Sequence, residues 1–447
     1  MSETTWLLDR FQEFGSQTAL IMKDQEFSFT GLYEEINNWS GILVQKEISA
    51  GECIAIIGDF SGSAVALLFA LLLNNCISIP IASDEEQQIG ELLKIAEVTA
   101  VFEFTGNKEY NFRRLPEKGN HPLIKKLRME HQPGLILFSS GSTGKKKASL
   151  LNFTGLLDKF KEKRMGYRTL VFLLPDHIGG LNTLLYVLTQ GGTAVFPTKR
   201  NPEYICSLIA QYRIQLLPTT PTFLNMLLIS EAYKKYDISS LEIITYGTEP
   251  MTESTLKHLH AVLPKVRLKQ TYGLSELGIL RTQSKDSQSL WVKVGGEGYR
   301  TKVIDNILWI KTTSAMLGYL NAPSPFDDEG WFNTGDSVLV DGEYMRILGR
   351  DSEIINVGGE KVYPAEVESV LLEMDNIRDA KVKGKPNPIT GNIVTVEVLL
   401  QEPEDPQLLR KRIRTFCRGK LAPYKIPATV EICSSEFYGE RFKKKRT

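Results

Sequence analysis

The sequence has few cysteines, no excess charge of either sign and no apolar run long enough to cross a bilayer. Its five cysteines are scattered without a Cys-x-x-Cys pair, which argues against a disulfide framework or zinc site and indicates a reducing compartment. Lys plus Arg and Asp plus Glu are equal at 53 each, which gives no footprint for nucleic acid. The longest apolar run, residues 64–73, ends at two asparagines, and the amino terminus lacks a signal-peptide pattern. We therefore expect a cytoplasmic protein with no membrane span and no nucleic-acid partner.

What the sequence does contain is a long alternation of strand and helix patterns. At 447 residues the chain exceeds what one hydrophobic core usually supports, so two or more domains are expected. Apolar runs at 53–57 and 77–81 predict buried strands, and the patterns at 32–43 and 62–73 predict helices. Strand, helix and strand at this spacing predict a doubly wound parallel α/β sheet. The polar, basic segment 107–132 is expected to be a surface connection.

The most distinctive stretch follows a predicted strand at 134–138. Residues 139–148 read Ser-Ser-Gly-Ser-Thr-Gly-Lys-Lys-Lys-Ala. Glycines let backbone N–H groups converge, hydroxyls add donors and lysines add positive charge, a combination that suits a polyphosphate. A P-loop is excluded, because Gly144 has Ser139 rather than glycine five positions before it. A polar turn beside a solvated run of charge is the alternative interpretation of this stretch alone.

This stretch resembles the phosphate-binding signature of the AMP-forming adenylating enzymes, which include acyl- and aryl-CoA ligases, peptide-synthetase adenylation domains and luciferases. Lys146 stands where that family usually has proline, which leaves Lys147 as the family's lysine. The resemblance also places Thr143 near a metal ion. The nucleotide-binding residues it implies here are Ser139, Ser140, Gly141, Ser142, Thr143, Gly144 and Lys147.

Two later motifs resemble signatures of the same family. Residues 271–276 read Thr-Tyr-Gly-Leu-Ser-Glu, in which Tyr272 can stack on adenine and Glu276 can hold a Mg²⁺ that bridges phosphates. Residues 330–336 read Gly-Trp-Phe-Asn-Thr-Gly-Asp, in which Asp336 can accept both ribose hydroxyls. A β-hairpin closed by an aspartate is the alternative for that segment. The nucleotide contacts implied by these motifs and by the turn at 247–250 are Gly247, Thr248, Glu249, Tyr272, Gly273, Ser275 and Asp336.

The acid-binding side of the implied site is indicated by His177 and Leu173. His177 begins a His-x-x-Gly run similar to one beside the acid pocket of CoA ligases, although a lone histidine at a strand end is more often structural. Leu173 stands where relatives that activate α-amino acids have an aspartate. A buried ammonium would lack a partner there, so a simple α-amino acid is not expected. The pocket, which includes Gly247, is expected around residues 177–181, 219–223 and 246–248.

A signature beginning at Gly349-Arg350 marks a predicted domain boundary. The resemblance implies that Arg350 contacts the ribose or phosphates and that Ser352 occupies the hinge, where most relatives have Asp or Lys. It also implies that Gly358 and Gly359 form a loop that approaches the pantetheine channel. The expected domains are residues 1–348 and 349–447.

The carboxy-terminal tail decides where the family's catalytic lysine would lie. The family ends in a Gly-Lys pair, and this tail reads Gly-Glu-Arg-Phe-Lys-Lys-Lys-Arg-Thr from residue 439. If Gly439 is the family's glycine, Glu440 replaces the lysine and adenylation should fail. If the pattern Ser-Gly-Lys-x-x-Arg is laid on residues 441–446, Lys443 takes the catalytic position and the arginine also matches. We prefer the second alignment because it satisfies two positions; a basic, disordered tail is the third interpretation.

Together these signatures predict a large amino-terminal domain of doubly wound α/β sheets and a small, mobile α+β domain. The implied function is ATP-dependent activation of a small-molecule carboxylic acid to an acyl-AMP, with release of pyrophosphate, followed by transfer to coenzyme A. Glu276 and Lys443 are the expected catalytic residues, with ATP and Mg²⁺. One alternative is an acyl-AMP ligase that loads the phosphopantetheine of a carrier protein, whose acidic surface would meet the basic residues 411–418, although these equally suit a solvated helix face. The other is a non-catalytic nucleotide-binding relative that acts as a scaffold.

Overall fold

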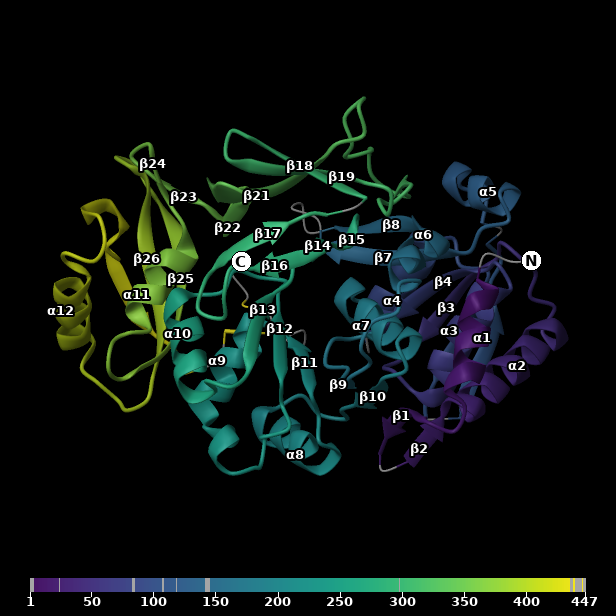
Figure 1. Cartoon of the computed structure of the whole chain (residues 1–447). Coiled ribbons are helices and arrows are strands. Elements are labelled where there is room, and N and C mark those ends of the chain that lie inside the picture. Colours follow the sequence, from purple (N-terminus) through teal and green to yellow (C-terminus); the bar gives the residue numbers. More distant parts are fainter. Residues whose placement is uncertain are drawn as a thin grey trace.

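A computed structural model describes the fold of residues 4–23, 25–82, 85–106, 108–117, 119–140, 145–296, 298–434, 437–438 and 444 (Figure 1). The amino-terminal helices α1 Thr5–Phe14 and α2 Phe29–Gln45 lie at one end of the molecule. The small carboxy-terminal part, with α11 Pro364–Leu371, α12 Pro406–Cys417 and the strands β23 to β26 between residues 355 and 400, lies at the other (Figure 1). Between them stand two seven-stranded sheets and a six-stranded sheet. In the described part of the chain, no helix is both long and apolar enough to cross a membrane.

The first seven-stranded sheet has the order β20-β8-β7-β4-β3-β5-β6. Its centre is parallel, since β3 pairs with β4 and β5, and its edges are antiparallel. Every residue of β3 and β4 is buried, as expected for strands covered by helices on both faces. The strands are β3 Cys53–Ile57, β4 Ile77–Ile81, β5 Ala100–Phe104, β6 Tyr110–Arg114, β7 Gly134–Ser140, β8 Lys146–Asn152 and β20 Gly318–Tyr319. The helices of this region are α2 Phe29–Gln45, α3 Gly62–Leu73, α4 Glu86–Ile95, α5 Pro122–Met129 and α6 Phe153–Leu157.

The second seven-stranded sheet has the order β13-β12-β11-β9-β10-β1-β2 and is parallel except at β2. Each of its crossover helices begins with a side chain that caps the first turn, such as Asn201 for α8 and Thr252 for α10. The strands are β1 Thr18–Met22, β2 Gln25–Ser28, β9 Arg168–Leu170, β10 Thr193–Phe196, β11 Leu216–Thr219, β12 Ile243–Tyr246 and β13 Arg267–Gln270. The helices are α1 Thr5–Phe14, α7 Ile178–Thr189, α8 Pro202–Tyr212, α9 Pro221–Ser230 and α10 Glu253–Val262.

Two smaller sheets complete the fold. The six-stranded sheet contains β16 Thr282–Ser284, β17 Trp291–Val294, β18 Tyr299–Ile304, β19 Ile307–Thr312, β21 Phe332–Asp341 and β22 Tyr344–Arg350. The five-stranded sheet contains β23 Ile355–Val357, β24 Glu360–Val362, β25 Ile377–Asn387, β26 Gly391–Leu400 and β27 Thr429–Ile432. The last sheet packs with α11 Pro364–Leu371 and α12 Pro406–Cys417 around its own apolar core. A short hairpin, β14 Gly273–Leu274 and β15 Gly278–Ile279, lies beside α7.

The fold class expected from the sequence is confirmed, and so are the strands at 53–57 and 77–81 and the helix at 62–73. The expectation of a plain surface connection over 107–132 was wrong. That segment contains the edge strand β6, whose residues alternate between half-buried and exposed positions, and the helix α5, which buries Ile124 and Leu127. An edge strand and a helix with basic residues on its open face look like loop from composition alone.

The start of α7 gives a test of packing. A β-carbon added at Gly180 would lie 2.1 Å from the Leu174 carbonyl oxygen, so the turn before the helix leaves no space for a side chain. We expect Gly180→Ala to lower the free energy of unfolding by about 1–3 kcal/mol because the backbone must shift. Gly41→Ala is the matched control, since a β-carbon at this exposed position of α2 meets no atom within 4 Å. The control should stabilise by about 0.5–1 kcal/mol in urea unfolding, and equal effects of the two substitutions would contradict this account.

Candidate active site

Two segments that are distant in sequence meet at Asp336. The Arg350 Nε donates to Asp336 Oδ1 at 2.8 Å, and the Tyr272 hydroxyl donates to Asp336 Oδ2. These contacts follow from the hairpin of β21 and β22, which places Asp336 directly opposite Arg350. The Arg350 Nη1 also donates to the Thr334 carbonyl oxygen at 2.8 Å. Asp336 lies inside strand β21, so the alternative of an aspartate that closes the hairpin turn is wrong.

The Asp336 carboxylate is almost fully buried, with 6% of its surface exposed. Burial raises the pKa of Asp336 above its ordinary value, although the Arg350 guanidinium opposes that effect. Burial and the nearby Asp336 also raise the pKa of Tyr272, so its phenol stays protonated and remains a donor. The carboxylate is therefore held in one orientation by two donors, and its remaining lone pairs can accept further hydrogen bonds.

Glu276 is the second buried carboxylate of the site, with 8% of its surface exposed. Its Oε1 accepts hydrogen bonds from the Tyr319 hydroxyl at 2.8 Å and from Ser139 Oγ at 3.3 Å. The Lys147 ammonium lies 5.1 Å from the centre of the Tyr319 ring, within range of a cation–π interaction. Ser139 and Lys147 are opposite each other in the β7–β8 pair. The fold thus brings together the start of the phosphate signature and Glu276.

Tyr319 and Asn321 are candidate site residues that the sequence reasoning missed. Tyr319 lies in β20, which pairs with β8, and Asn321 follows it. The Asn321 side chain accepts from the Ala148 N–H at 3.0 Å and donates to the Lys146 carbonyl oxygen at 2.8 Å, which fixes the strand after the phosphate signature. The signal available in the sequence was the Gly-Tyr-x-Asn run at 318–321, whose two polar side chains lie two residues apart.

The environment of Glu276 fits a hard divalent cation. Both hydrogen bonds described for its carboxylate go to Oε1, and within the described segments Oε2 accepts none from another protein group. The described residues contain no group of three or more His, Cys, Asp or Glu side chains that could hold a metal alone. Mg²⁺ in nucleotide sites is typically bound by one or two carboxylates together with phosphate oxygens. Glu276 can supply such a carboxylate.

The turn at 247–249 lies against the motif that contains Tyr272. A β-carbon at Gly247 would lie 2.6 Å from Thr271 Oγ1, so this position requires glycine, and Thr248 has a left-handed backbone with φ of 75°. Gly273 belongs to β14, and Ser275 lies in the turn to β15. Glu249 Oε1 accepts from the Thr222 N–H at 2.9 Å in the first turn of α9, one of the segments expected to line the acid pocket.

His177 caps α7 in the structure. Its Nδ1 accepts a hydrogen bond from the Gly179 N–H at 2.9 Å, so this nitrogen carries no proton. The structural role considered for this histidine is therefore present, and a contact with substrate stays a prediction. Leu173 is half-buried beside Gly179, whose added β-carbon would lie 2.7 Å from it.

The described part of the tail contacts both the small domain and the large domain. The Lys444 ammonium lies 2.8 Å from Asp379 Oδ1 and 3.9 Å from Glu368 Oε2, and it donates to the Ala380 carbonyl oxygen at 2.7 Å. The Lys444 backbone N–H donates to Glu249 Oε2 at 3.2 Å. A single residue therefore binds the small domain through its side chain and the large domain through its backbone.

Several residues predicted from the sequence lie outside the described residues, so their placement is not tested. They are Gly141, Ser142, Thr143 and Gly144 of the phosphate signature, Gly439 and Glu440, and Lys443; of Ser140, the backbone alone is described. The choice between Lys443 and Glu440 as the counterpart of the family's lysine stays open.

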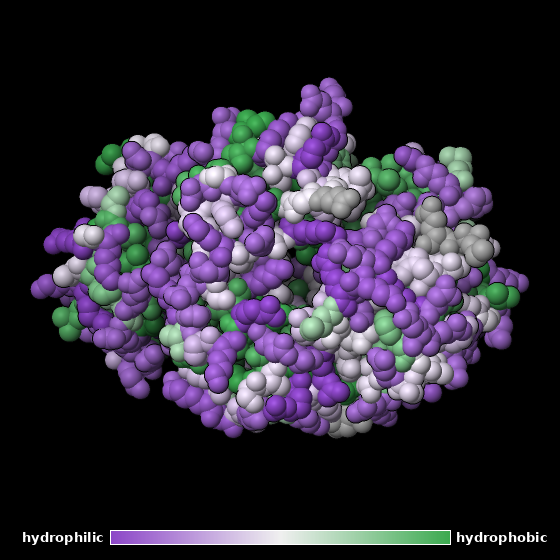
Figure 2. All heavy atoms as spheres, in the orientation of Figure 1, coloured by the Kyte–Doolittle hydropathy of each residue, from purple (hydrophilic) through white to green (hydrophobic). Residues whose placement is uncertain are grey.

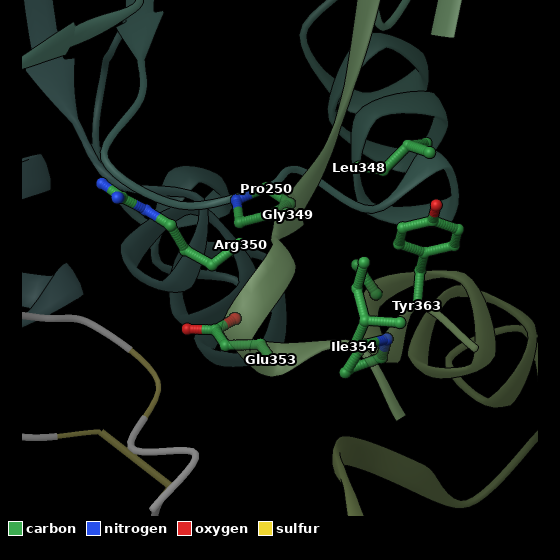
Figure 3. A pocket seen from close by; sticks show the side chains of 9 residues that line it. Pro250, Leu348, Gly349, Arg350, Glu353, Ile354 and Tyr363 are labelled. Atoms are coloured by element: carbon green, nitrogen blue, oxygen red, sulfur yellow. The ribbon is translucent and has the colours of Figure 1, made fainter. Parts of the chain in front are cut away.

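The junction between the two parts is hollowed beside Arg350 (Figure 3). The side chains of Arg350 and Glu353 extend to one side of the chain, and those of Ile354 and Tyr363 extend to the other (Figure 3). Ser352 lies in the single turn Asp351–Glu353 between β22 and β23. The hollow is lined by Pro250, Leu348, Gly349, Arg350, Glu353, Ile354, Tyr363, Pro364 and Ala365.

Gly358 and Gly359 form the exposed turn between β23 and β24. Both have positive φ, 63° and 92°, and an added β-carbon at either meets no atom within 4 Å. Their conformation requires glycine, but their surroundings leave open space that another molecule can approach.

The chain matches the family described as AMP-binding enzyme over residues 7–320, and the AMP-binding enzyme C-terminal domain over residues 366–438. It therefore belongs to the AMP-binding enzymes, a family that uses ATP, and the family expected from the sequence is confirmed. Its relatives are named as ligases that join small-molecule acids to coenzyme A, which supports an AMP-forming acid–thiol ligase of the acyl-CoA synthetase type.

Individual relatives resemble the chain along nearly all of its length. The 2-succinylbenzoate–CoA ligase of Bacillus pumilus is 26% identical and covers 97% of this chain and 94% of its own length. The indoleacetate–CoA ligase of Aromatoleum aromaticum is 28% identical and covers 93% and 91%. The solved structure of the anthranilate CoA ligase AuaEII with anthranoyl-AMP has a TM-score of 0.84 at 19% identity, and covers 98% of this chain and 95% of its own. ATP-bound MatB from Rhodopseudomonas palustris has a TM-score of 0.80 at 20% identity, with 97% and 96% covered.

The hydrogen bond from Tyr319 to Glu276 predicts what removal of the Tyr319 hydroxyl does to Mg²⁺-dependent nucleotide binding. Tyr319→Phe keeps the ring beneath Lys147 and removes the donor to Glu276, so the carboxylate loses its fixed orientation. A hydrogen bond to a charged group contributes about 1.5–3 kcal/mol, so the Mg²⁺ concentration for half-maximal nucleotide binding should rise roughly tenfold or more. Tyr236→Phe, in the loop that packs against the core beneath α9, is the control. Calorimetric titration of both variants with ATP at a series of Mg²⁺ concentrations measures the effect. If ATP binding depends on Mg²⁺ equally in the two variants, this role for Tyr319 is disproved.

The cluster at Lys444 predicts a large loss of stability. The Lys444, Asp379 and Glu368 side chains are only 10%, 9% and 1% exposed. Lys444→Met would remove the ammonium that lies beside two buried carboxylates, and breaking a buried ion pair costs about 3–5 kcal/mol. Lys420→Met, which removes an exposed pair with Glu373, should cost at most about 1 kcal/mol. Hydrogen exchange at the amides of β25 and β26 measures both; protection factors that are the same for the two variants would contradict the prediction.

Proposed function

We propose that this protein joins ATP and an aryl or aliphatic carboxylic acid as an acyl-AMP, releases pyrophosphate, and transfers the acyl group to the thiol of coenzyme A. The observation that carries the proposal is the convergence of two buried carboxylates with their donors: Asp336 with Tyr272 and Arg350, and Glu276 with Tyr319. Buried carboxylates held by specific donors suit a ligand with both hydroxyl groups and metal-bound phosphates. A nucleoside triphosphate has both.

The chemistry explains why the site needs this charge distribution. A carboxylate is a poor electrophile, and its attack on the α-phosphorus brings two anionic groups together. In the proposal, Asp336 accepts the ribose hydroxyls and Arg350 contacts the ribose or phosphates. Mg²⁺, when bound by Glu276, neutralises phosphate charge, and Lys147 and the hydroxyls that begin at Ser139 add to that positive field. Catalysis of this kind consists mainly of positioning and electrostatic stabilisation.

The nucleotide base and the acid would lie on the two sides of the turn at 247–249. In the proposal Tyr272 contributes to the adenine side, although its hydroxyl is already bonded to Asp336. The acid would approach His177 and the first turn of α9, where Glu249 holds the Thr222 N–H. Leu173 supplies no charge for an ammonium, which supports an acid without an α-amino group. Relatives named for 2-succinylbenzoate, indoleacetate and anthranilate support an aryl acid.

A rotation of the small domain would separate the two half-reactions. We propose domains of 1–348 and 349–447 with Ser352 at the hinge; since β22 extends to Arg350, the rotation would be absorbed in the turn Asp351–Glu353. Lys443 would enter the site for adenylation, and the Gly358–Gly359 turn would enter for thiol transfer. The backbone contact of Lys444 with Glu249 supports this proposal, because it puts the tail at the turn beside the nucleotide site.

A carrier protein is the alternative acceptor. The basic residues of α12 support this alternative, because they could bind an acidic carrier. However, Arg412 donates to Glu404 and to the Asp375 carbonyl oxygen, so part of that positive charge is already neutralised. A scaffold that binds nucleotide without turnover is the other alternative, and would follow if Glu440 replaces the catalytic lysine. A cytoplasmic location belongs to the proposal and rests on the scattered cysteines.

Pyrophosphate release across a panel of carboxylic acids tests the proposal. With hydroxylamine to trap acyl-AMP, release should depend on the acid and should rise further when coenzyme A is added. Lys443→Ala should abolish acid-dependent release, with Lys445→Ala as the neighbouring control. Release that ignores coenzyme A but responds to a phosphopantetheinylated carrier would select the alternative acceptor. ATP binding without release for any acid would select the scaffold.

A further inference from the structure

Both carboxylate oxygens of Glu249 accept a backbone hydrogen bond, and the two donors belong to different parts of the protein. Oε1 accepts from the Thr222 N–H at 2.9 Å in the first turn of α9, and Oε2 accepts from the Lys444 N–H at 3.2 Å in the tail. The Lys444 ammonium is fixed on the small domain, where it donates to Asp379 Oδ1 at 2.8 Å and to the Ala380 carbonyl oxygen at 2.7 Å. A carboxylate of the large domain therefore holds the small domain through the tail.

A second polar contact joins the domains five residues farther along the chain. The Ser254 N–H, in the first turn of α10, donates to Ser369 Oγ of α11 at 3.1 Å, and the two hydroxyl oxygens lie 3.3 Å apart. Amides in the first turn of a helix have no partner within the helix, so Ser369 supplies the one that Ser254 needs. Glu249 and Ser254 thus belong to one short segment, which begins at the Gly247 turn beside the candidate site.

The junction that these hydrogen bonds span has little apolar packing to support it. The core residues of the small domain lie between 355 and 430, and those of the neighbouring core of the large domain lie between 21 and 290. Near Pro250 and Tyr363 the junction is hollow (Figure 3). On the face seen in Figure 2, hydrophilic residues predominate where the small domain meets the large one. An interface of this kind can open and close again without exposing a large apolar surface.

We propose that Glu249 is a positioning residue that latches the small domain in the arrangement used for adenylation, and that this latch opens before thiol transfer. The inference rests on the proposed function and deepens it, because it names the contacts that separate the two half-reactions. In the latched arrangement, Glu249 holds the tail beside the turn at 247–249, where the nucleotide and the acid would meet.

Rotation of the small domain would break both contacts together. The Lys444 N–H would leave Glu249, and the Ser254 N–H would leave Ser369. Thr222 belongs to the large domain and stays bonded to Glu249, so the carboxylate keeps one donor in both arrangements. The latch therefore costs one hydrogen bond to a charged group when it opens, without leaving that charge unpartnered.

Hydrogen exchange tests the latch without any reaction. Glu249→Gln removes the charge and one acceptor oxygen, so the Ser254 amide should exchange about tenfold faster, the scale of one lost hydrogen bond to a charged group. Ser254 reports movement of the whole domain, because its partner is Ser369 and not Glu249. Glu242→Gln is the matched control, since Glu242 precedes β12, accepts from Gln215 Nε2 at 2.9 Å within the large domain, and should leave this exchange unchanged. Faster exchange confined to α9 would make Glu249 a local cap of that helix and would overturn the inference.

A reversible disulfide tests the order of the two half-reactions. Ser254→Cys combined with Ser369→Cys places two thiols where the hydroxyl oxygens lie 3.3 Å apart, so oxidation should join the domains in the latched arrangement. The oxidised protein should still form acyl-AMP in a single turnover but should lose transfer to coenzyme A, and reduction should restore the transfer. Ser369→Cys alone, treated with the same oxidant, is the control and should keep both steps. Transfer at an equal rate before and after reduction would contradict the proposal.

The two half-reactions also separate a latch from a general structural defect. Glu249→Gln should slow acyl-AMP formation about tenfold and leave transfer from bound acyl-AMP no slower, because it weakens the latched arrangement alone. Equal slowing of both steps would overturn the inference. If the native protein releases no pyrophosphate with any acid, the proposed function fails, and exchange at Ser254 still decides whether Glu249 holds the small domain.

Discussion

The interaction on which the site depends is the buried carboxylate of Asp336 between the Tyr272 hydroxyl and the Arg350 guanidinium. A buried carboxylate is unfavourable unless donors surround it, so its presence requires the β14 hairpin and the β21–β22 hairpin to meet. Arg350 is the last residue of β22, and the chain passes from there into the smaller domain. The same contact therefore builds the ribose side of the proposed site and fixes the point from which the second domain extends. The Asp336 carboxylate therefore serves both the proposed site and the junction between the two domains.

On the phosphate side of the proposed site, Glu276 is likewise a buried carboxylate held by hydrogen-bond donors. Its carboxylate is held by Tyr319 and Ser139, and Tyr319 also lies beneath the Lys147 ammonium. Asn321 then fixes the strand that carries Lys147. The short strand β20 thus links a carboxylate that suits a metal ion to a lysine that suits a phosphate. Because these groups have opposite charges and share one support, their separation is set by the fold rather than by their mutual attraction.

Lys444 connects the tail to both domains through its side chain and its backbone. Lys444 is neutralised within the small domain by Asp379 and Glu368, and the free energy of that cluster holds the tail in place.

The sequence by itself determined the family, the α/β architecture and the order of the signatures, because apolar periodicity and short motifs are local properties of the chain. It also singled out Asp336, Glu276, Tyr272 and Arg350 as candidate site residues, since each stands in a motif with its own spacing. The tertiary structure alone decided that Asp336 is bonded by Tyr272 and Arg350, that Tyr319 supports Glu276, and that Lys444 bridges two domains. It also showed that the expected surface connection at 107–132 contains β6 and α5, because an edge strand and a basic helix are recognised by what they pair with and bury. Those facts depend on contacts between residues up to 195 positions apart, as for Lys444 and Glu249, and no local pattern records them.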